Sequence, residues 1–180
     1  HDWKATGHGY VDLHKALVQS CDVYFYTIGQ RMGIDTMAEY AKDFGLGHET
    51  GIELPSERVG SIPSTAWKLK VKKEAWLPGE TISAAIGQGY VTVTPLQMAS
   101  MIGTVANDGV SYRPRLVQAI MDRTTGNLQE MPAVARGKAH AKPETFRIIK
   151  EALAAVVTEG TATRAKSSIV TIGGKTGTAQ

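Results

Sequence analysis

The feature that most constrains this chain is its C-terminal stretch, residues 169–180, in which β-branched residues give way to glycines and small polar side chains. Isoleucine and valine at its start favour a β-strand, and three glycines remove side chains where a ligand or another backbone must come close. Lys175, Thr176 and Thr178 then supply one ammonium group and two hydroxyls. On a strand, the two threonines would share one face and Lys175 would point to the other. We therefore predict a strand whose polar edge suits an extended, anionic ligand.

A phosphate-binding P-loop is the first alternative for this stretch, because Gly174-Lys175-Thr176 matches the closing triplet of that motif. The motif also needs a glycine five residues before Gly174, where this chain has Ile169, and a helix directly afterwards. Only four residues follow Thr176. The spacing therefore argues against nucleotide binding at this stretch.

The composition is that of an ordinary globular domain. The 180 residues are 42% hydrophobic and 21% charged, which is enough for one domain with its own core. A net charge of +3 does not indicate nucleic-acid binding, and the densest basic run (Lys68, Lys70, Lys72 and Lys73) is expected to be a solvated face. The chain has no apolar run of about 18 residues that could cross a membrane. We therefore expect no nucleic-acid partner and no membrane-spanning segment within these residues.

Cysteine and histidine usage predicts neither a disulfide nor a metal site. The single cysteine, Cys21, cannot form an internal disulfide and is expected to be a small buried hydrophobe. The histidines lie at positions 1, 8, 14, 48 and 140, without the paired spacing typical of metal ligands. We therefore expect no metal and no cofactor. Because the chain begins with neither an initiator methionine nor a signal peptide, we also expect it to be a piece of a longer protein.

Capping residues and apolar periodicity predict five helices. The strongest signal is Thr94-Pro95-Leu96-Gln97, in which Thr94 and Gln97 form a capping box and proline takes the first helical position. Asp12 and Asp35 are placed to cap two earlier helices, and Gly45 is placed to end the second of these. The predicted helices span about residues 13–20, 23–32, 36–44, 95–106 and 143–159.

The remaining segments are predicted to be irregular or weakly stranded. Residues 47–82 contain three prolines, with Trp67 and Trp76 as the apolar anchors of what we expect to be a long loop. Later segments are predicted as a strand at 112–121, a turn at 124–127, a return strand to about 131 and a linker at 132–142.

Two motifs far apart in the chain resemble a known family. Ser20-x-Asp22, at a corner between two predicted helices, and Lys175-Thr176-Gly177 are similar to the Ser-x-Asn and Lys-Thr-Gly signatures of penicillin-binding proteins. Asp22 stands where most of the wider family has Asn. The elongation-type branch resembles this chain in using Asp at this position. Longer blocks extend the resemblance to elongation-type class B transpeptidases: residues 20–26, 86–90, 94–99 and 175–180.

The resemblance implies an α+β fold of the penicillin-binding protein and serine β-lactamase type. This chain would hold mainly the helical subdomain and the Lys-Thr-Gly strand, so residues 1–180 would be a partial transpeptidase domain, truncated at both ends. The family's first signature, Ser-x-x-Lys, carries the nucleophile, and no serine here has a lysine three positions later. We therefore expect the fragment to be catalytically silent. Because the other strands of the family's sheet would lie outside this chain, we also expect its terminal strand to lack neighbours.

The resemblance also implies catalytic roles. In the family, the nucleophilic serine attacks the D-Ala-D-Ala amide of a peptidoglycan stem peptide and passes the acyl group to an amine of a neighbouring strand. Ser20 would relay a proton to the leaving amine. Asp22 would hold either Ser20 or the lysine of the missing motif, and Lys175 would supply positive charge.

Four further residues are expected to bind substrate. The hydroxyls of Thr176 and Thr178 would hold its carboxylate, and Gly177 would let it lie along the strand. The backbone N–H of Thr178 would be one oxyanion donor. Gln88 would either line the groove or pack its own loop.

The implied partners are stem peptides, β-lactams and the cell-wall elongation machinery. The implied location is the bacterial cell envelope, on the periplasmic side of the inner membrane, with an N-terminal anchor outside this chain. The alternative is a non-catalytic module of the same fold that binds β-lactam or peptidoglycan as a sensor. A Ser-x-x-Lys motif before His1 would favour the enzyme.

Overall fold

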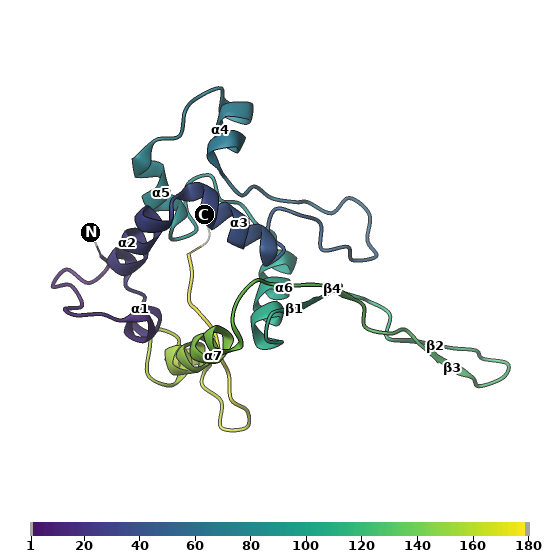
Figure 1. Cartoon of the computed structure of the whole chain (residues 1–180). Coiled ribbons are helices and arrows are strands. Elements are labelled where there is room, and N and C mark those ends of the chain that lie inside the picture. Colours follow the sequence, from purple (N-terminus) through teal and green to yellow (C-terminus); the bar gives the residue numbers. More distant parts are fainter. Residues whose placement is uncertain (1, 179–180) are drawn as a thin grey trace.

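The computed structural model describes residues 2–178, in which helices form most of the regular structure and a narrow β-ribbon extends to one side (Figure 1). All five predicted helices are present. The helices are α1 (Leu13–Gln19), α2 (Asp22–Met32), α3 (Ile34–Asp43), α4 (Thr65–Lys72), α5 (Pro78–Ala84), α6 (Pro95–Ala106) and α7 (Pro143–Thr158), with a 3-10 turn at Thr163–Ala165. The strands are β1 (Val110–Tyr112), β2 (Ala119–Met121), β3 (Leu128–Glu130) and β4 (Ala135–Lys138).

The first two helices meet at a sharp corner. Asp12 caps α1 as predicted, because its carboxylate accepts a hydrogen bond from the N–H of Lys15 at 2.8 Å. Ser20 ends α1 in the left-handed conformation, with φ 52° and ψ 53°, and α2 starts two residues later. This turn places Ser20 and Asp22 on either side of the corner.

The capping prediction for α3 is half right. Gly45 and Leu46 close its C-terminus with the paired backbone hydrogen bonds of a Schellman motif, to Lys42 and Ala41 respectively. Asp35 is not the N-cap, because the helix already begins at Ile34. Its carboxylate instead accepts hydrogen bonds from the N–H and hydroxyl of Thr65, 30 residues away.

The prediction of one long loop at residues 47–82 is wrong, because α4 and α5 lie within it. Ser64 caps α4 through a hydrogen bond from the N–H of Trp67, and Pro78 takes the first position of α5. The three prolines in this stretch favour a loop prediction, although one of them begins a short helix.

The prediction that Lys68 lies on a solvated face is also wrong. Its side chain is 1% exposed and its Nζ lies 2.6 Å from Glu80 Oε1, between α4 and α5. The rings of Trp76 and Tyr90 cover the ammonium group at 6.0 and 5.9 Å. Lys68 is therefore shielded by Glu80 and the aromatic rings, whereas Lys70, Lys72 and Lys73 are exposed as predicted.

The capping box of α6 is confirmed. Thr94 Oγ1 accepts from the N–H of Gln97, and Gln97 Oε1 accepts from the N–H of Thr94. The Gln97 amide, which is 1% exposed, also donates to the carbonyls of His48 and Val59. Gln97 thus joins α6 to the loop that precedes α4.

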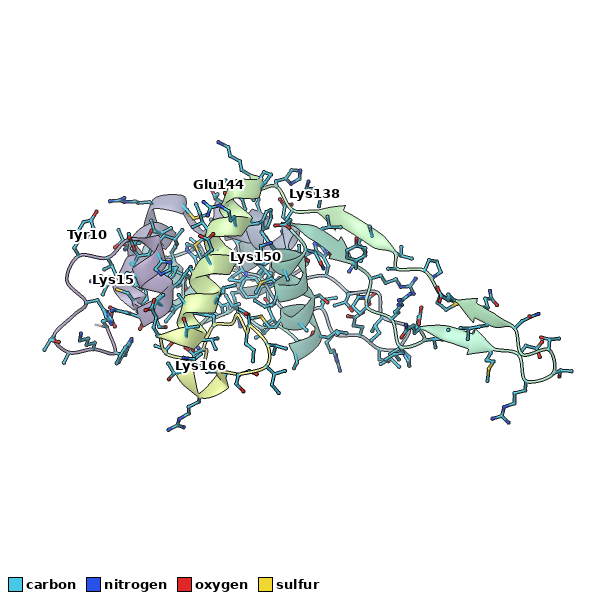
Figure 2. All side chains as sticks on the ribbon, turned by 90° about the horizontal axis from the view of Figure 1, so that it is seen from below. Tyr10, Lys15, Lys138, Glu144, Lys150 and Lys166 are labelled. Carbon is cyan, nitrogen blue, oxygen red and sulfur yellow. The ribbon has the colours of Figure 1, made fainter. Side chains whose placement is uncertain are left out.

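The strand predictions need two corrections. Residues 112–121 are not one strand, because β1 ends at Tyr112 and Pro114, which lacks an N–H, interrupts the ladder before β2. Residues 132–142 are not a linker throughout, because β4 pairs antiparallel with β1. The turn and return strand are confirmed, since β3 pairs with β2 in a ribbon that projects away from the helices (Figures 1 and 2).

Helix α7 contributes more buried apolar side chains to the core than any other described element. Its buried side chains are Phe146, Ala152, Leu153, Val156 and Val157, which lie on one face of the helix. This face packs against α1, where Ala16 and Val18 are buried.

The terminal strand prediction is wrong over the described residues 169–178, and Ala179 and Gln180 lie outside them. A strand needs a neighbour for its N–H and C=O groups, and the described part of the chain supplies none here. The segment is instead fixed to α7 by a hydrogen bond from the N–H of Gly174 to the carbonyl of Leu153, at 3.1 Å. Among the described helices, none is long and apolar enough to cross a membrane.

Candidate active site

One pocket of about 830 Å³ is lined by residues from both ends of the chain. Its walls come from the α1–α2 corner, the loop after α5, the turn after α7 and the C-terminal segment. All seven residues predicted for the site line it: Ser20, Asp22, Gln88, Lys175, Thr176, Gly177 and Thr178. The fold thus brings the predicted set together, while the role of each member stays a prediction.

Ser20 and Lys175 are in direct contact. Lys175 Nζ lies 2.8 Å from Ser20 Oγ and donates a hydrogen bond to it. An ammonium group can only donate, so Ser20 Oγ accepts from Lys175 and its own proton stays free for another acceptor. This leaves Ser20 ready to give a proton to a group in the pocket.

Lys175 and Thr176 converge on the same side, contrary to the alternation expected of a strand. Lys175 Nζ donates to Thr176 Oγ1 at 3.2 Å and to the Thr176 carbonyl at 3.1 Å. Because the segment is not paired in a sheet, its side chains need not alternate. The ammonium and the hydroxyl therefore form one polar surface.

Burial shifts the pKa values of the two charged groups in the pocket toward each other. Burial raises the pKa of Asp22, as does repulsion from Asp2, while Lys175 opposes the rise. Burial lowers the pKa of Lys175, and attraction to Asp22 opposes that fall. In the described structure Ser20 accepts a hydrogen bond from Lys175 and makes none with Asp22, and both roles predicted for Asp22 stay predictions.

Gln88 bridges two walls of the pocket. Its amide Nε2 donates to the carbonyl of Thr178 at 3.2 Å. Gln88 lies in the loop between α5 and the β-bridge at Thr92, next to Tyr90, whose ring packs on Trp67 and Trp76. The aromatic cluster around Lys68 therefore supports the loop that carries Gln88.

Sequence reasoning missed six residues of the pocket wall: Trp3, Leu17, Phe25, Ala85, Ile86 and Thr161. Two of them, Trp3 and Thr161, make polar contacts there. The indole N–H of Trp3 lies 3.0 Å from the Gln19 carbonyl and 3.1 Å from the Ser20 carbonyl, and so stabilises the end of α1. Thr161 Oγ1 lies 2.9 Å from Thr176 Oγ1. A single tryptophan or threonine in a loop gives no local signal of such contacts.

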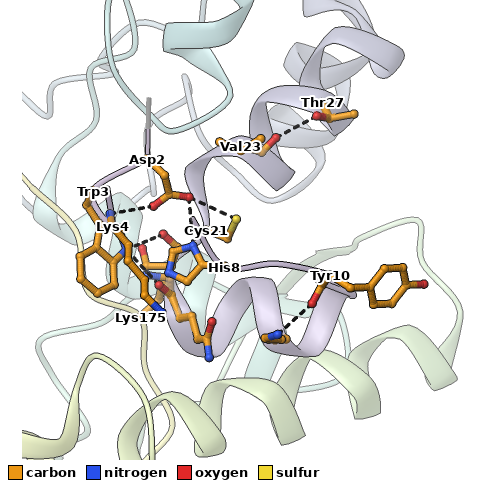
Figure 3. A network of polar contacts seen from close by, with 12 residues as sticks. Asp2, Trp3, Lys4, His8, Tyr10, Cys21, Val23, Thr27 and Lys175 are labelled. Carbon is orange, nitrogen blue, oxygen red and sulfur yellow. Dashed lines mark hydrogen bonds and ion pairs between the residues drawn. The ribbon is translucent and has the colours of Figure 1, made fainter. Parts of the chain in front are cut away.

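The search by spacing also missed a group that could hold a metal ion. Asp2, His8 and Cys21 place one ligand atom each within 4.8 Å of one another (Figure 3). Asp2 Oδ2 lies 3.1 Å from His8 Nδ1 and accepts from the Cys21 thiol at 3.3 Å. Carboxylate, imidazole and thiolate are all Zn²⁺ ligands. Cys21 is buried as predicted, and this burial raises the pKa of its thiol.

Hydrogen bonds keep Asp2 ionised within this group. Burial alone would raise the pKa of its carboxyl, but the hydrogen bonds from Cys21 and from the N–H of Lys4, together with His8, lower it. The side chains of Asp2 and His8 are only 5% and 2% exposed. His8 Nε2 is buried and meets no hydrogen-bond partner in the described part of the chain.

Comparison with known proteins decides the family. The family model described as the penicillin binding protein transpeptidase domain matches residues 1–180. This chain belongs to that family. The peptidoglycan D,D-transpeptidase MrdA of Acinetobacter baumannii is 40% identical over 179 residues, which are 99% of this chain and 26% of the relative. MrdA of Haemophilus influenzae is 49% identical over 119 residues, 66% of this chain and 18% of the relative.

Solved structures of penicillin-binding proteins share the fold. PBP2 from Helicobacter pylori gives a TM-score of 0.84 at 32% identity, covering 100% of this chain and 33% of that one. PBP2 from Pseudomonas aeruginosa, in complex with WCK 5153, gives 0.85 at 32% identity, covering 100% and 41%. These matches confirm the predicted α+β penicillin-binding protein fold. The present chain thus spans 26% and 18% of these curated relatives and less than half of the solved ones.

Proposed function

We propose that these 180 residues are part of a peptidoglycan D,D-transpeptidase, which cross-links stem peptides through a serine acyl-enzyme and is acylated by β-lactams. The observation that carries the proposal is the 2.8 Å contact between Lys175 Nζ and Ser20 Oγ, in the wall of a pocket that Thr176 and Thr178 also line. Membership of the penicillin-binding protein family supports the reaction class.

The nucleophile is proposed to lie outside these residues, since none of them forms a Ser-x-x-Lys motif. Its oxygen adds to the carbonyl carbon of the D-Ala-D-Ala amide, and the C–N bond then breaks. Ser20 relays to the leaving amine the proton that the nucleophile gives up. The hydrogen bond from Lys175 favours this relay because it leaves the Ser20 proton free, and positioned proton transfer typically contributes about 10²–10⁴ in rate. An amine of a neighbouring strand then takes the acyl group.

Substrate binding is proposed to centre on the C-terminal segment. The Lys175 ammonium and the hydroxyls of Thr176 and Thr178 form a donor surface for the terminal carboxylate of the stem peptide. The hydrogen bond from Gln88 to the Thr178 carbonyl helps to hold the backbone of Thr178, whose own N–H would serve as one oxyanion donor. At Gly177, an added Cβ would meet nothing within 4 Å, so the pocket is open there.

The partners proposed for the whole protein are stem peptides, β-lactams and the elongation machinery of the cell wall. The solved complex of H. pylori PBP2 with MreC supports a partner of that class. We propose a location on the periplasmic side of the inner membrane, with an anchor outside residues 1–180, which would be a partial transpeptidase domain.

Fluorescent-penicillin labelling tests this function. The full-length protein should label covalently, whereas the 180-residue chain should not. Ser20→Ala should slow labelling of the full-length protein strongly, while Ser100→Ala, which removes a hydroxyl on α6 outside the pocket wall, should leave it unchanged. A full-length protein that binds penicillin reversibly without a covalent product would instead favour the sensor module.

A further inference from the structure

Thr161, in the turn after α7, contacts the donor surface of the pocket. Its Oγ1 lies 2.9 Å from Thr176 Oγ1, and both residues line the pocket wall with Ser20 and Lys175. Thr161 belongs to neither of the two motifs and lies 15 residues before Thr176.

The backbone around Thr161 is fixed from two sides. The N–H of Thr161 donates to the Val18 carbonyl of α1 at 3.2 Å, and the N–H of Ala162 donates to the Val156 carbonyl of α7 at 3.0 Å. The preceding Gly160 packs so closely that an added Cβ would lie 2.4 Å from the Val18 carbonyl oxygen. The turn is therefore held against the same helix that ends at Ser20.

The hydrogen bonds that the Thr176 hydroxyl can make define a role for Thr161. A hydroxyl has two acceptor lone pairs and one proton. Lys175 Nζ, which can only donate, uses one lone pair of Thr176 Oγ1. If Thr161 donates to the other, the proton of Thr176 has to point away from both partners, into the pocket. If Thr176 instead donates to Thr161, its proton is not available for a hydrogen bond to a bound anion.

We infer that Thr161 is a positioning residue that donates to Thr176 and so directs the Thr176 hydroxyl proton toward the carboxylate of the bound ligand. A carboxylate is acceptor-only, and it stabilises the arrangement in which Thr176 donates to it. The inference rests on the proposed function, because it takes the ligand to be a stem peptide or β-lactam with a carboxylate next to Thr176.

The test compares acylation of the full-length protein by benzylpenicillin and by its methyl ester, which lacks the carboxylate charge. Thr161→Val keeps the shape of the side chain but removes the hydroxyl, and Thr161→Ser keeps the hydroxyl. With benzylpenicillin, Thr161→Val should lower the second-order rate of acylation about 10-fold or more, as expected for a hydrogen bond to a charged group, and Thr161→Ser should restore most of it. With the ester, Thr161→Val and wild type should react at similar rates. Thr158→Val, which removes a hydroxyl at the end of α7 outside the pocket wall, is the matched control.

The outcomes separate the two levels of the proposal. Equal loss of rate on benzylpenicillin and ester would show that Thr161 only supports the pocket, and an unchanged rate on benzylpenicillin would show that it has no role; either overturns the inference. If the wild-type protein is not acylated by benzylpenicillin, the proposed function fails, and the role of Thr161 with it. Should Thr161→Val not fold, Thr161→Ala removes the same hydroxyl with a smaller side chain and gives the same comparison.

Discussion

Lys175 Nζ and Ser20 Oγ lie 2.8 Å apart although 155 residues separate them in the chain. Helix α7 makes this contact possible. It packs against α1, whose end is Ser20, and the carbonyl of Leu153 on the same helix holds the N–H of Gly174, next to Lys175. One helix thus supports both halves of the pocket.

The Ser20–Lys175 contact predicts strong coupling between the two residues. In the full-length protein, Ser20→Ala and Lys175→Met should each lower the rate of acylation by about 10²–10⁴, because each removes one end of the proposed proton relay. The double variant should lose little more than the worse single variant, because residues that act as a unit are not additive. Stopped-flow measurement with a chromogenic β-lactam gives the three rates. Additive losses would show that the two side chains act separately.

Asp22→Asn should change the pH dependence of acylation. Burial lowers the pKa of Lys175 and attraction to Asp22 partly restores it. Removing the Asp22 charge takes away the restoring attraction, so Lys175 should lose its proton at a lower pH and the alkaline limb of the rate profile should move to lower pH. Asp12→Asn, at the N-cap of α1 outside the pocket wall, is the control and should leave that limb in place. A shift to higher pH, or none, would contradict the coupling.

Lys68→Met should lower the melting temperature clearly, whereas Lys70→Met should not. Lys68 is 1% exposed and bonded to Glu80, so its loss leaves a partly buried carboxylate without its partner. Lys70 lies two residues further along α4 and is exposed, where substitutions usually change stability little. Circular dichroism melting measures both variants. Glu80→Gln added to Lys68→Met should recover part of the loss, and equal melting of Lys68→Met and wild type would show that the ion pair contributes nothing.

Gly29→Ala and Gly103→Ala should have opposite effects on stability. At Gly29, in α2, a Cβ would lie 2.5 Å from the Cβ of Ala85, so α2 would have to move away from the end of α5, at a cost of about 1–3 kcal/mol. At Gly103, in α6, a Cβ would meet nothing within 4 Å, and alanine should stabilise the helix by up to about 1 kcal/mol. Urea denaturation midpoints give both values. A neutral Gly29→Ala would mean that the α2–α5 packing yields easily.

Predictions from the sequence succeeded where the signal was local. Asp12, Gly45 and the Thr94–Gln97 capping box each bond backbone groups within a few residues, so neighbouring letters are enough to find them. The family motifs also selected seven residues that line one pocket, because a known family supplied the pairing between distant segments.

Predictions failed where the environment of a residue is set by distant parts of the chain. The burial of Lys68 depends on Glu80 and on the rings of Trp76 and Tyr90, which a run of lysines does not reveal. The strand proposed for residues 169–180 needs a neighbouring strand, and no composition of its own can replace one. Thr161 enters the pocket only because its turn packs on α1.

The β2–β3 ribbon should unfold locally more often than the rest of the domain. Each strand has three residues and, among those described, pairs only with the other, while Ile120, Met121 and Leu128 stay largely in solvent. A two-stranded ribbon of this kind is at most marginally stable by itself. Its amide protons should therefore exchange through frequent local opening, whereas those of α7 should exchange only when the whole domain unfolds. The ribbon is thus a separate, weakly stable unit, and its opening leaves the pocket intact.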